Sequence, residues 1–158
     1  MVLVLGCCAD RLFANGFALP DQDAFATGRG EAFVATADNP SAIYYNPAGI
    51  SQLSGNNLRG GFYGIYYNPS YRPPGGGNPY HSSYNLAAIP QLFYTHTFTN
   101  SILTLGLGVY APFGGNIDWP QDTGFRTAAT QGKLTYLSIN PVAGLQLAPN
   151  LSDRKSVV

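Results

Sequence analysis

Side chains that could carry out catalysis or hold a metal are few in this sequence, and they do not cluster. His81 falls in a loop rich in proline, glycine and serine, and His96 falls in a segment where apolar and polar residues alternate. The two cysteines, Cys7 and Cys8, are adjacent and are not expected to form a structural disulfide. No group of His, Cys, Asp or Glu has metal-site spacing, and no nucleophile turn or phosphate-binding glycine loop is present. We therefore expect no catalytic residue, no metal and no cofactor.

Two Asn-Pro steps are more informative than these reactive residues. Asparagine is a good helix N-cap, and proline suits the first helical position because its missing N–H is not needed there. The pattern predicts two very short helices, one from Pro40 and one from Pro47. The apolar residues around them are more than so small a unit can bury by itself: Ile43, Tyr44, Tyr45, Ile50 and Leu53. The unit must therefore sit inside a larger structure.

The same region carries a resemblance to a known family. The run Asn15-Gly16-Phe17-Ala18-Leu19, the small residues of 24–37 and the motif Asn46-Pro47-Ala48 resemble the N-terminal hatch of a Gram-negative outer-membrane family. That family contains the long-chain fatty acid transporters and the aromatic-hydrocarbon channels. The resemblance covers about residues 15–53, and the strands behind it fit to about residue 151. It implies an all-β fold, a transmembrane antiparallel β-barrel of the outer membrane with a hatch folded into its lumen.

The composition agrees with a barrel. Charged residues make up 10% of the chain, against about 25% in typical soluble domains. Eight basic and eight acidic residues cancel, so nothing attracts the chain to nucleic acid. No apolar run approaches the roughly 18 residues of a membrane helix. If the chain spans a membrane, it must do so as a closed barrel, because only helices and barrels satisfy every backbone polar group in lipid.

The strand pattern predicts the first four strands of such a barrel, over residues 58–67, 88–98, 102–110 and 133–147. Leucines and a valine share one face of the third strand, while Thr104, Gly106 and Gly108 share the other. An apolar outer face and a small or polar inner face are typical of membrane barrels, as is the alternation of long and short connections. The two faces of the first strand are both aromatic, and the sequence leaves open which meets lipid. Residues 68–85 and 111–132 are expected to be long external loops.

Four segments follow from this interpretation. Residues 1–14 resemble a signal-peptide remnant, with cleavage after Leu12-Phe13-Ala14 but no basic n-region. Residues 15–56 form the hatch, and residues 57–152 form the four strands with their two loops. Residues 153–158 look like the translation of a sequencing adapter and are expected to be non-native; a charged turn before a fifth strand is the alternative. Four strands cannot close a barrel, and the family's barrels have about fourteen, within the known range, so we expect a fragment of a longer protein.

The resemblance implies passive uptake of hydrophobic compounds, with long-chain fatty acids as the default substrate. A ligand would be captured by apolar loop residues, pass to a lumen pocket beside the hatch, and leave sideways into the bilayer when the hatch rearranges. Asn46, Pro47 and Ala48 would form the hatch motif. The ligand-contact candidates are Phe17, Leu19, Tyr44, Tyr45, Phe113 and Trp119.

Several points stay open in the sequence. Phe113 and Trp119 could instead belong to an aromatic girdle or pack within their loop. Gly106 and Gly108 could mark a lateral exit or simply make space for the hatch. The expected partners are a hydrophobic small molecule and outer-membrane lipid, with a monomeric full-length protein. The alternative functions are a structural or adhesive barrel, which would show no saturable uptake, and an outer-membrane lipase with its catalytic residues elsewhere.

Overall fold

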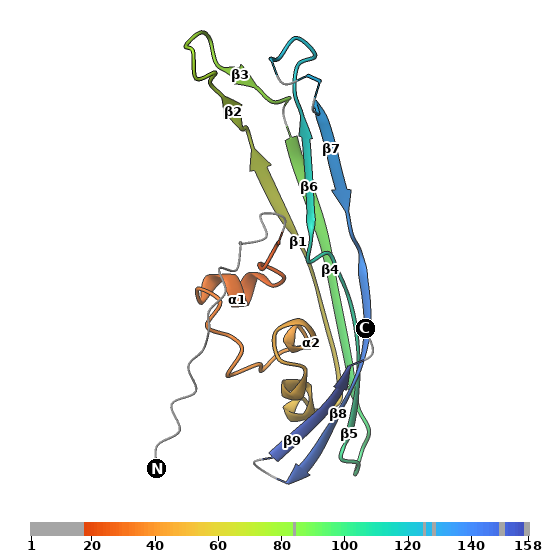
Figure 1. Cartoon of the computed structure of the whole chain (residues 1–158). Coiled ribbons are helices and arrows are strands. Elements are labelled where there is room, and N and C mark those ends of the chain that lie inside the picture. The colour runs from red at the N-terminus through yellow and green to blue at the C-terminus, as the bar shows by residue number, and fades with distance from the viewer. Residues whose placement is uncertain (1–17, 84, 125, 128, 149–150, 157–158) are drawn as a thin grey trace, which may run out of the picture.

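The computed structural model describes residues 18–83, 85–124, 126–127, 129–148 and 151–156. Long antiparallel strands form a curved sheet, and a short helical unit lies against its concave face (Figure 1). We call residues 18–55 the N-terminal unit. The predicted signal segment, residues 1–14, and Phe17 lie outside the described residues.

Five strands make up the main sheet, in the order β1-β4-β5-β8-β9. They are β1 (Asn56–Tyr67), β4 (Asn85–Thr97), β5 (Leu103–Tyr110), β8 (Ser138–Ala148) and β9 (Leu151–Ser156). All neighbours are antiparallel, and Leu105 of β5 lies opposite His96 of β4 on one side and Ala143 of β8 on the other. The short turn between β4 and β5 places Asn100 at a φ of 57°, a conformation that asparagine tolerates better than most residues. The structure thus shows the all-β antiparallel fold that the sequence predicts.

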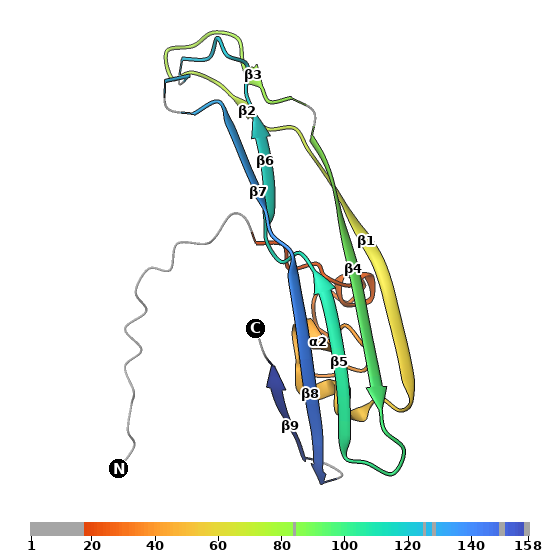
Figure 2. The ribbon, with the colours of Figure 1, turned by 90° about the vertical axis from the view of Figure 1, so that its right-hand side faces the viewer.

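Two small hairpins extend beyond the main sheet, where the sequence predicts long irregular loops (Figure 2). One pairs β2 (Ser70–Tyr71) with β3 (Tyr80–His81), and the other pairs β6 (Gly114–Asp118) with β7 (Gln131–Thr135). The expected strand over 133–147 is therefore divided between β7 and β8. The segments expected to be long loops thus contain short paired strands, which the sequence did not predict.

Residues 151–156 pair with β8 as β9, with Asp153 opposite Leu145 and Lys155 opposite Ala143. Backbone pairing does not test whether residues 153–158 are native, so that interpretation stays a prediction. Val157 and Val158 lie outside the described residues.

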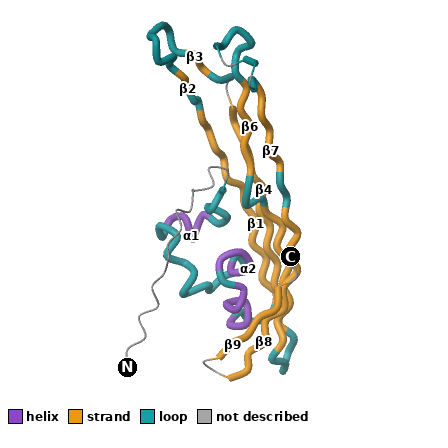
Figure 3. Tube along the Cα trace, viewed as in Figure 1, coloured by secondary structure: helices purple, strands orange, loops and turns teal. Residues whose placement is uncertain are grey.

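The N-terminal unit contains three short helical elements, coloured purple in Figure 3. They are α1 (Ala24–Gly28), α2 (Ala42–Tyr45) and the 3₁₀ helix η1 (Pro47–Gln52). The second Asn-Pro step starts η1 with Pro47 at its first turn, as predicted. The first does not start a helix at Pro40: α2 begins at Ala42, because the Asn39 Oδ1 accepts the Ser41 N–H at 2.8 Å in a local turn. No sequence signal predicted α1.

The two faces of the main sheet differ in chemistry. Its outer face carries exposed apolar side chains, among them Phe62 of β1 at 80% exposure, so the first strand turns this row outward. The same face carries Leu58, Tyr66, Leu92, Leu105, Leu107, Ile139, Leu145 and Leu147. The inner face carries polar or small residues and a few apolar ones: Gln91, Phe93, Thr95, Thr104, Gly106, Gly108, Asn140, Val142 and Gly144. No helix in the described ranges is both long enough and apolar enough to cross a membrane.

Candidate functional site

The Asn46-Pro47-Ala48 motif forms the junction between α2 and η1. The Asn46 N–H closes α2 on the Ala42 carbonyl at 2.8 Å, and the Asn46 carbonyl accepts the Gly49 N–H at 2.8 Å. Its side chain does not cap η1. The Asn46 amide instead donates to the Val34 carbonyl at 2.9 Å, which ties the motif to the preceding turn. Pro47 is buried, and the Ala48 carbonyl accepts the Ser51 hydroxyl at 2.8 Å.

Close packing behind this junction depends on Gly49. A Cβ atom at Gly49 would lie 2.4 Å from the Ala37 Cβ and 2.5 Å from the Ala37 carbonyl oxygen. Ala37 itself has a φ of 42°, which is unfavourable for a residue with a side chain. The Gln52 side chain donates to the carbonyls of Thr36 and Ala37 at 2.8 and 2.9 Å. These contacts fix the turn before α2.

Two isoleucines dock the N-terminal unit on the inner face of the sheet. Ile43 lies against Gly106 and Gly108, where added Cβ atoms would come within 2.9 and 2.8 Å of it. Ile50 lies in the same way against Gly144, at 2.9 Å. Both isoleucines are buried. The glycines of the wall thus leave space that the two isoleucine side chains fill. A side chain at any of these glycines would overlap an isoleucine.

An aromatic cluster continues the contact from the N-terminal unit to the wall. Phe33 packs edge-on against Tyr45, Tyr45 against Tyr44, and Tyr44 against Tyr110 of β5, with ring centroids 4.8–5.4 Å apart. Phe93 of β4 stacks on Tyr110 at 5.6 Å. Tyr44 and Tyr45 were expected from the sequence to contact a ligand, whereas Phe33, Phe93 and Tyr110 were not. For Phe93 the sequence did contain a signal: it alternates with the outward residues Leu92 and Tyr94, which places it on the inner face of the strand.

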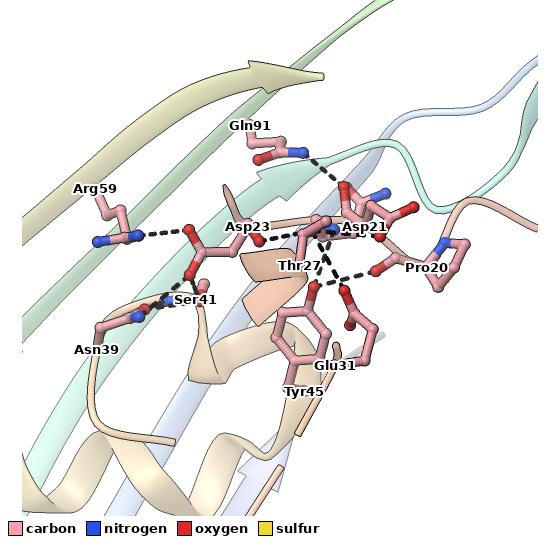
Figure 4. Close-up of polar contacts among 11 residues, drawn as sticks. Pro20, Asp21, Asp23, Thr27, Glu31, Asn39, Ser41, Tyr45, Arg59 and Gln91 are labelled. Atoms are coloured by element: carbon pink, nitrogen blue, oxygen red, sulfur yellow. Dashed lines mark hydrogen bonds and ion pairs between the residues drawn. The ribbon is translucent and has the colours of Figure 1, made fainter. Parts of the chain in front are cut away.

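A charged anchor joins the N-terminal unit to the edge strand β1 (Figure 4). Asp23, the residue before α1, receives an ion pair from Arg59 Nε to its Oδ1 at 2.6 Å. Its other oxygen accepts from the Ser41 hydroxyl at 2.9 Å and the Asn39 amide at 3.2 Å. The Asp23 side chain is 6% exposed, so these partners compensate for the water that its carboxylate oxygens lose on burial. The pairing of Asp23 with Arg59 was not predicted from the sequence.

Residues 18–22 lie between the start of the described chain and α1 and contain no helix; this stretch, which we call the extended segment, makes a second set of polar contacts with the wall. The Gln91 side chain of β4 donates to the Asp21 carbonyl at 3.0 Å. The Gln22 side chain donates to the Ala111 carbonyl at 3.0 Å, and the Leu19 N–H donates to the Pro112 carbonyl at 2.8 Å. This segment therefore bridges β4 and the end of β5.

The segment crosses a break in the strand ladder. Pairing of β5 with β8 ends at Tyr110 opposite Ser138, and pairing of β6 with β7 begins at Gly114 opposite Thr135. Three residues, 111–113, thus face two, 136–137, which is the count of a β-bulge. Pairing of β4 with β5 ends at Leu92 opposite Val109, and within the described residues β6 pairs with β7 and not with β4. We call residues 111–113 the strand break.

An acidic group lies beside the extended segment. The Thr27 hydroxyl contacts one oxygen of Asp21 and one of Glu31, each at 3.3 Å. Burial raises the pKa of Glu31, and the nearby Asp21 charge raises it further. The Tyr45 hydroxyl accepts the Gln22 N–H at 3.0 Å and donates to the Pro20 carbonyl at 3.1 Å. Burial is the main cause that raises the pKa of Tyr45, so this phenol stays neutral.

An open cavity of about 640 Å³ lies between α1 and the inner side of β1 and β4. The N-terminal unit contributes Asp23, Ala24, Thr27 and Gly28 to it. The wall contributes Arg59, Tyr63, Gln91 and Phe93, together with the neighbouring strand residues Leu58, Gly60, Gly61 and Phe62. Its volume is in the usual range for a small-molecule site.

The described ligand-contact candidates from the sequence fall into three places. Leu19 lies near the strand break, where an added Cβ at Gly114 would be 3.3 Å from it, and Phe113 forms an isolated bridge with Ala18. Tyr44 and Tyr45 belong to the aromatic cluster. Trp119 lies apart from both, at the end of the β6–β7 hairpin, where its N–H donates to the Thr130 carbonyl at 2.7 Å. In the described part of the chain, no three His, Cys, Asp or Glu side chains are placed to hold a metal.

Comparison with known proteins gives concordant matches. A family model described as "Outer membrane protein transport protein (OMPP1/FadL/TodX)" matches residues 5–153. A protein of Neisseria meningitidis serogroup B, named as a candidate outer membrane protein, is 30% identical over 135 residues. The crystal structure of a Pseudomonas aeruginosa FadL homologue has the same fold, with a TM-score of 0.66 at 19% identity.

The chain corresponds to a part of these relatives. The match to the Neisseria protein covers 79% of this chain and 29% of that protein. The match to the Pseudomonas structure covers 87% of this chain and 36% of that chain. The chain therefore spans about a third of the length of either relative.

Proposed function

The chain belongs to the outer membrane protein transport family (OMPP1/FadL/TodX) and lies in the outer membrane of a Gram-negative bacterium, and from this premise we propose that it supplies the hatch and first strands of a passive channel for hydrophobic molecules. Long-chain fatty acids are the substrate favoured by the resemblance of residues 15–53. The family is described by transport and not by catalysis, which supports the expectation that the chain is not an enzyme.

One observation carries the proposal: the N-terminal unit is docked on the inner face of a sheet whose outer face is apolar. The outer residues, such as Phe62 and Leu107, suit contact with outer-membrane lipid. On the inner face the unit is held by two isoleucines, by the aromatic cluster, by the Asp23–Arg59 ion pair and by the polar contacts of residues 18–22. Such a limited interface suits a unit that closes the channel when no ligand is bound and rearranges when a ligand binds.

Lateral release is the exit route that the strand break supports. Gly106 and Gly108 were one candidate exit in the sequence, but there β5 pairs on both sides: Gly106 lies opposite Thr95 and Val142. These glycines make space for Ile43. The break lies just beyond, at residues 111–113, where the extended segment with Leu19 crosses it. A ligand between the N-terminal unit and the wall would reach lipid here once residues 18–22 move.

Apolar contact would supply the affinity, at about 25 cal/mol for each Å² of apolar surface buried. Leu19, Tyr44 and Tyr45 are the proposed contacts near the hatch. Phe113 lies beside the proposed exit, 5.8 Å from Tyr136 between ring centroids. Phe113 and Trp119 are the proposed apolar residues of the outer loops. The full-length protein is proposed to act as a monomer.

The hatch role is tested by Asn46→Ala in the intact protein. Loss of the 2.9 Å bond to the Val34 carbonyl removes about 0.5–1.5 kcal/mol from the folded hatch. We expect altered uptake of labelled oleate at normal surface levels. Asn57→Ala is the matched control, because its amide also donates to a backbone carbonyl, that of Ser54 at 3.0 Å, but outside the helical elements.

Uptake by the Asn46 variant that equals wild type would remove the hatch role from the proposal. Absence of saturable oleate uptake by the wild-type protein would favour a structural or adhesive barrel instead.

A further inference from the structure

Arg59 uses only part of its hydrogen-bonding capacity. Its Nε donates to Asp23 at 2.6 Å, and within the described residues its two terminal nitrogens, Nη1 and Nη2, have no hydrogen-bond or ion-pair partner. The guanidinium carbon lies 5.7 Å from the centroid of the Phe25 ring. About a third of the side chain, 35%, is exposed. A charged, planar donor edge is therefore available beside an aromatic ring.

This edge belongs to the cavity between α1 and β1. Arg59 is the one basic residue among the cavity's described lining residues, and Asp23 is the one acidic residue. Phe93 and the two glycines of β1, Gly60 and Gly61, give the wall apolar and side-chain-free surface next to the charge. A cavity with a single cation and an adjoining apolar wall is complementary to an amphiphile with an anionic head.

Guanidinium chemistry specifies how such a head would bind. The two terminal nitrogens form a planar fork that matches the two oxygens of a carboxylate or the oxygens of a phosphate. Because Asp23 occupies Nε, the Nη edge can accept a second anion without first breaking the ion pair. We infer that Arg59 binds the anionic head of an amphiphilic ligand through its Nη atoms, with the apolar chain along the cavity wall. The inference rests on the proposed uptake function and assigns it a specificity residue.

Binding at Arg59 would also loosen the hatch. A second anion shares the charge that now compensates the buried Asp23, so the ion pair weakens and Asp23 depends more on the neutral donors Ser41 and Asn39. Asp23 immediately precedes α1, so its contact with β1 holds that helix near the wall. Ligand binding and release of this anchor are thus coupled, and the coupling is reciprocal: weakening the Asp23 contact strengthens ligand binding.

The test compares two ligands that share a chain and differ in the head, oleate and oleyl alcohol, by equilibrium binding to the intact protein. Arg59→Gln is expected to weaken oleate binding about tenfold, the effect of one charged hydrogen-bond pair, and to leave oleyl alcohol within about twofold. Arg59→Lys, which keeps the charge without the fork, is expected to fall between. Asp23→Asn is expected to strengthen oleate binding about fivefold and to leave oleyl alcohol unchanged.

Arg59→Gln leaves a buried carboxylate without its cation and could fail to fold, so the double variant Arg59→Gln/Asp23→Asn is measured beside it. The double variant removes both charges and is expected to show the same selective loss of oleate binding. Equal changes for oleate and oleyl alcohol would overturn the inference, since Arg59 would then act only through packing. Arg59-dependent oleate binding without oleate uptake by the wild-type protein would overturn the proposed function alone.

Discussion

Gly49 and the glycines of the wall both permit close packing of the N-terminal unit, but at different contacts. Gly49 lets the N-terminal unit fold tightly on itself at Ala37, whereas Gly106, Gly108 and Gly144 let the folded unit approach the sheet. In each case a hydrogen replaces a side chain where another heavy atom already lies within 3 Å. The residue type is dictated by the neighbour and not by the backbone angle.

Gly49→Ala is therefore expected to destabilise the N-terminal unit. The new methyl group would meet backbone and Cβ atoms of Ala37 that have no freedom to rotate away, and such overpacking costs about 1–3 kcal/mol. Hydrogen exchange of the amides in α2 and η1 should accelerate accordingly in the intact protein. Gly28→Ala is the control, because an added Cβ at Gly28 meets nothing within 4 Å. Equal exchange in the two variants would contradict this account of the packing.

At the scale of elements, the extended segment and the strand break form one arrangement. The backbone of residues 111–113 leaves the ladder, and residues 18–22 supply partners for two of its carbonyls, those of Ala111 and Pro112. Since a buried carbonyl without a partner is unfavourable, the break and the segment stabilise each other. If residues 18–22 moved away, the strand break would lose these partners. If β5 and β6 formed one continuous strand, residues 18–22 would lose the Ala111 and Pro112 carbonyls as acceptors.

Deletion of Pro112 tests the role of the break. It would place two residues opposite residues 136–137 and let β5 continue into β6 as one strand. We expect oleate uptake to fall toward that of vesicles without the protein, while the amount of folded protein is unchanged. Pro112→Ala is the control, since it keeps the extra residue and the carbonyl that Leu19 contacts. Normal uptake by the deletion variant would exclude lateral release at this position.

At the scale of the whole molecule, the sheet separates two environments. Leu105 and Leu107 of β5 point outward, and Thr104, Gly106 and Gly108 of the same strand point to the N-terminal unit. The same division holds on β4 and β8. An outer surface of this kind is stable in lipid and unfavourable in water.

Leu107→Arg is expected to destabilise the intact protein in the membrane by up to about 2–4 kcal/mol, the upper range for a basic side chain on the lipid face of a barrel. The measurement is the urea midpoint of folding into lipid vesicles. Ser101→Arg, in the exposed turn between β4 and β5, is the control and should change the stability by no more than about 1 kcal/mol. Equal effects of the two substitutions would mean that Leu107 does not face lipid.

The sequence by itself determined the fold class, the positions of β1, β4 and β5, and the Asn46-Pro47 junction, because these depend on local signals. Alternation with period two sets which side chains share a face, and proline at a helix start acts within one turn. The same alternation predicted that Thr104, Gly106 and Gly108 share one face of β5. The resemblance over residues 15–53 added the outer-membrane location, and the hatch role of these residues stays a proposal.

The tertiary structure alone decided which residues from distant positions meet. The Asp23–Arg59 ion pair joins positions 36 residues apart, and Gln22 meets Ala111 across 89. Nothing in the local pattern marks these partners, since their pairing depends on how the N-terminal unit docks on the sheet. The strand break was hidden for the same reason: a bulge is a mismatch between two strands, and one strand's sequence does not contain the register of its neighbour.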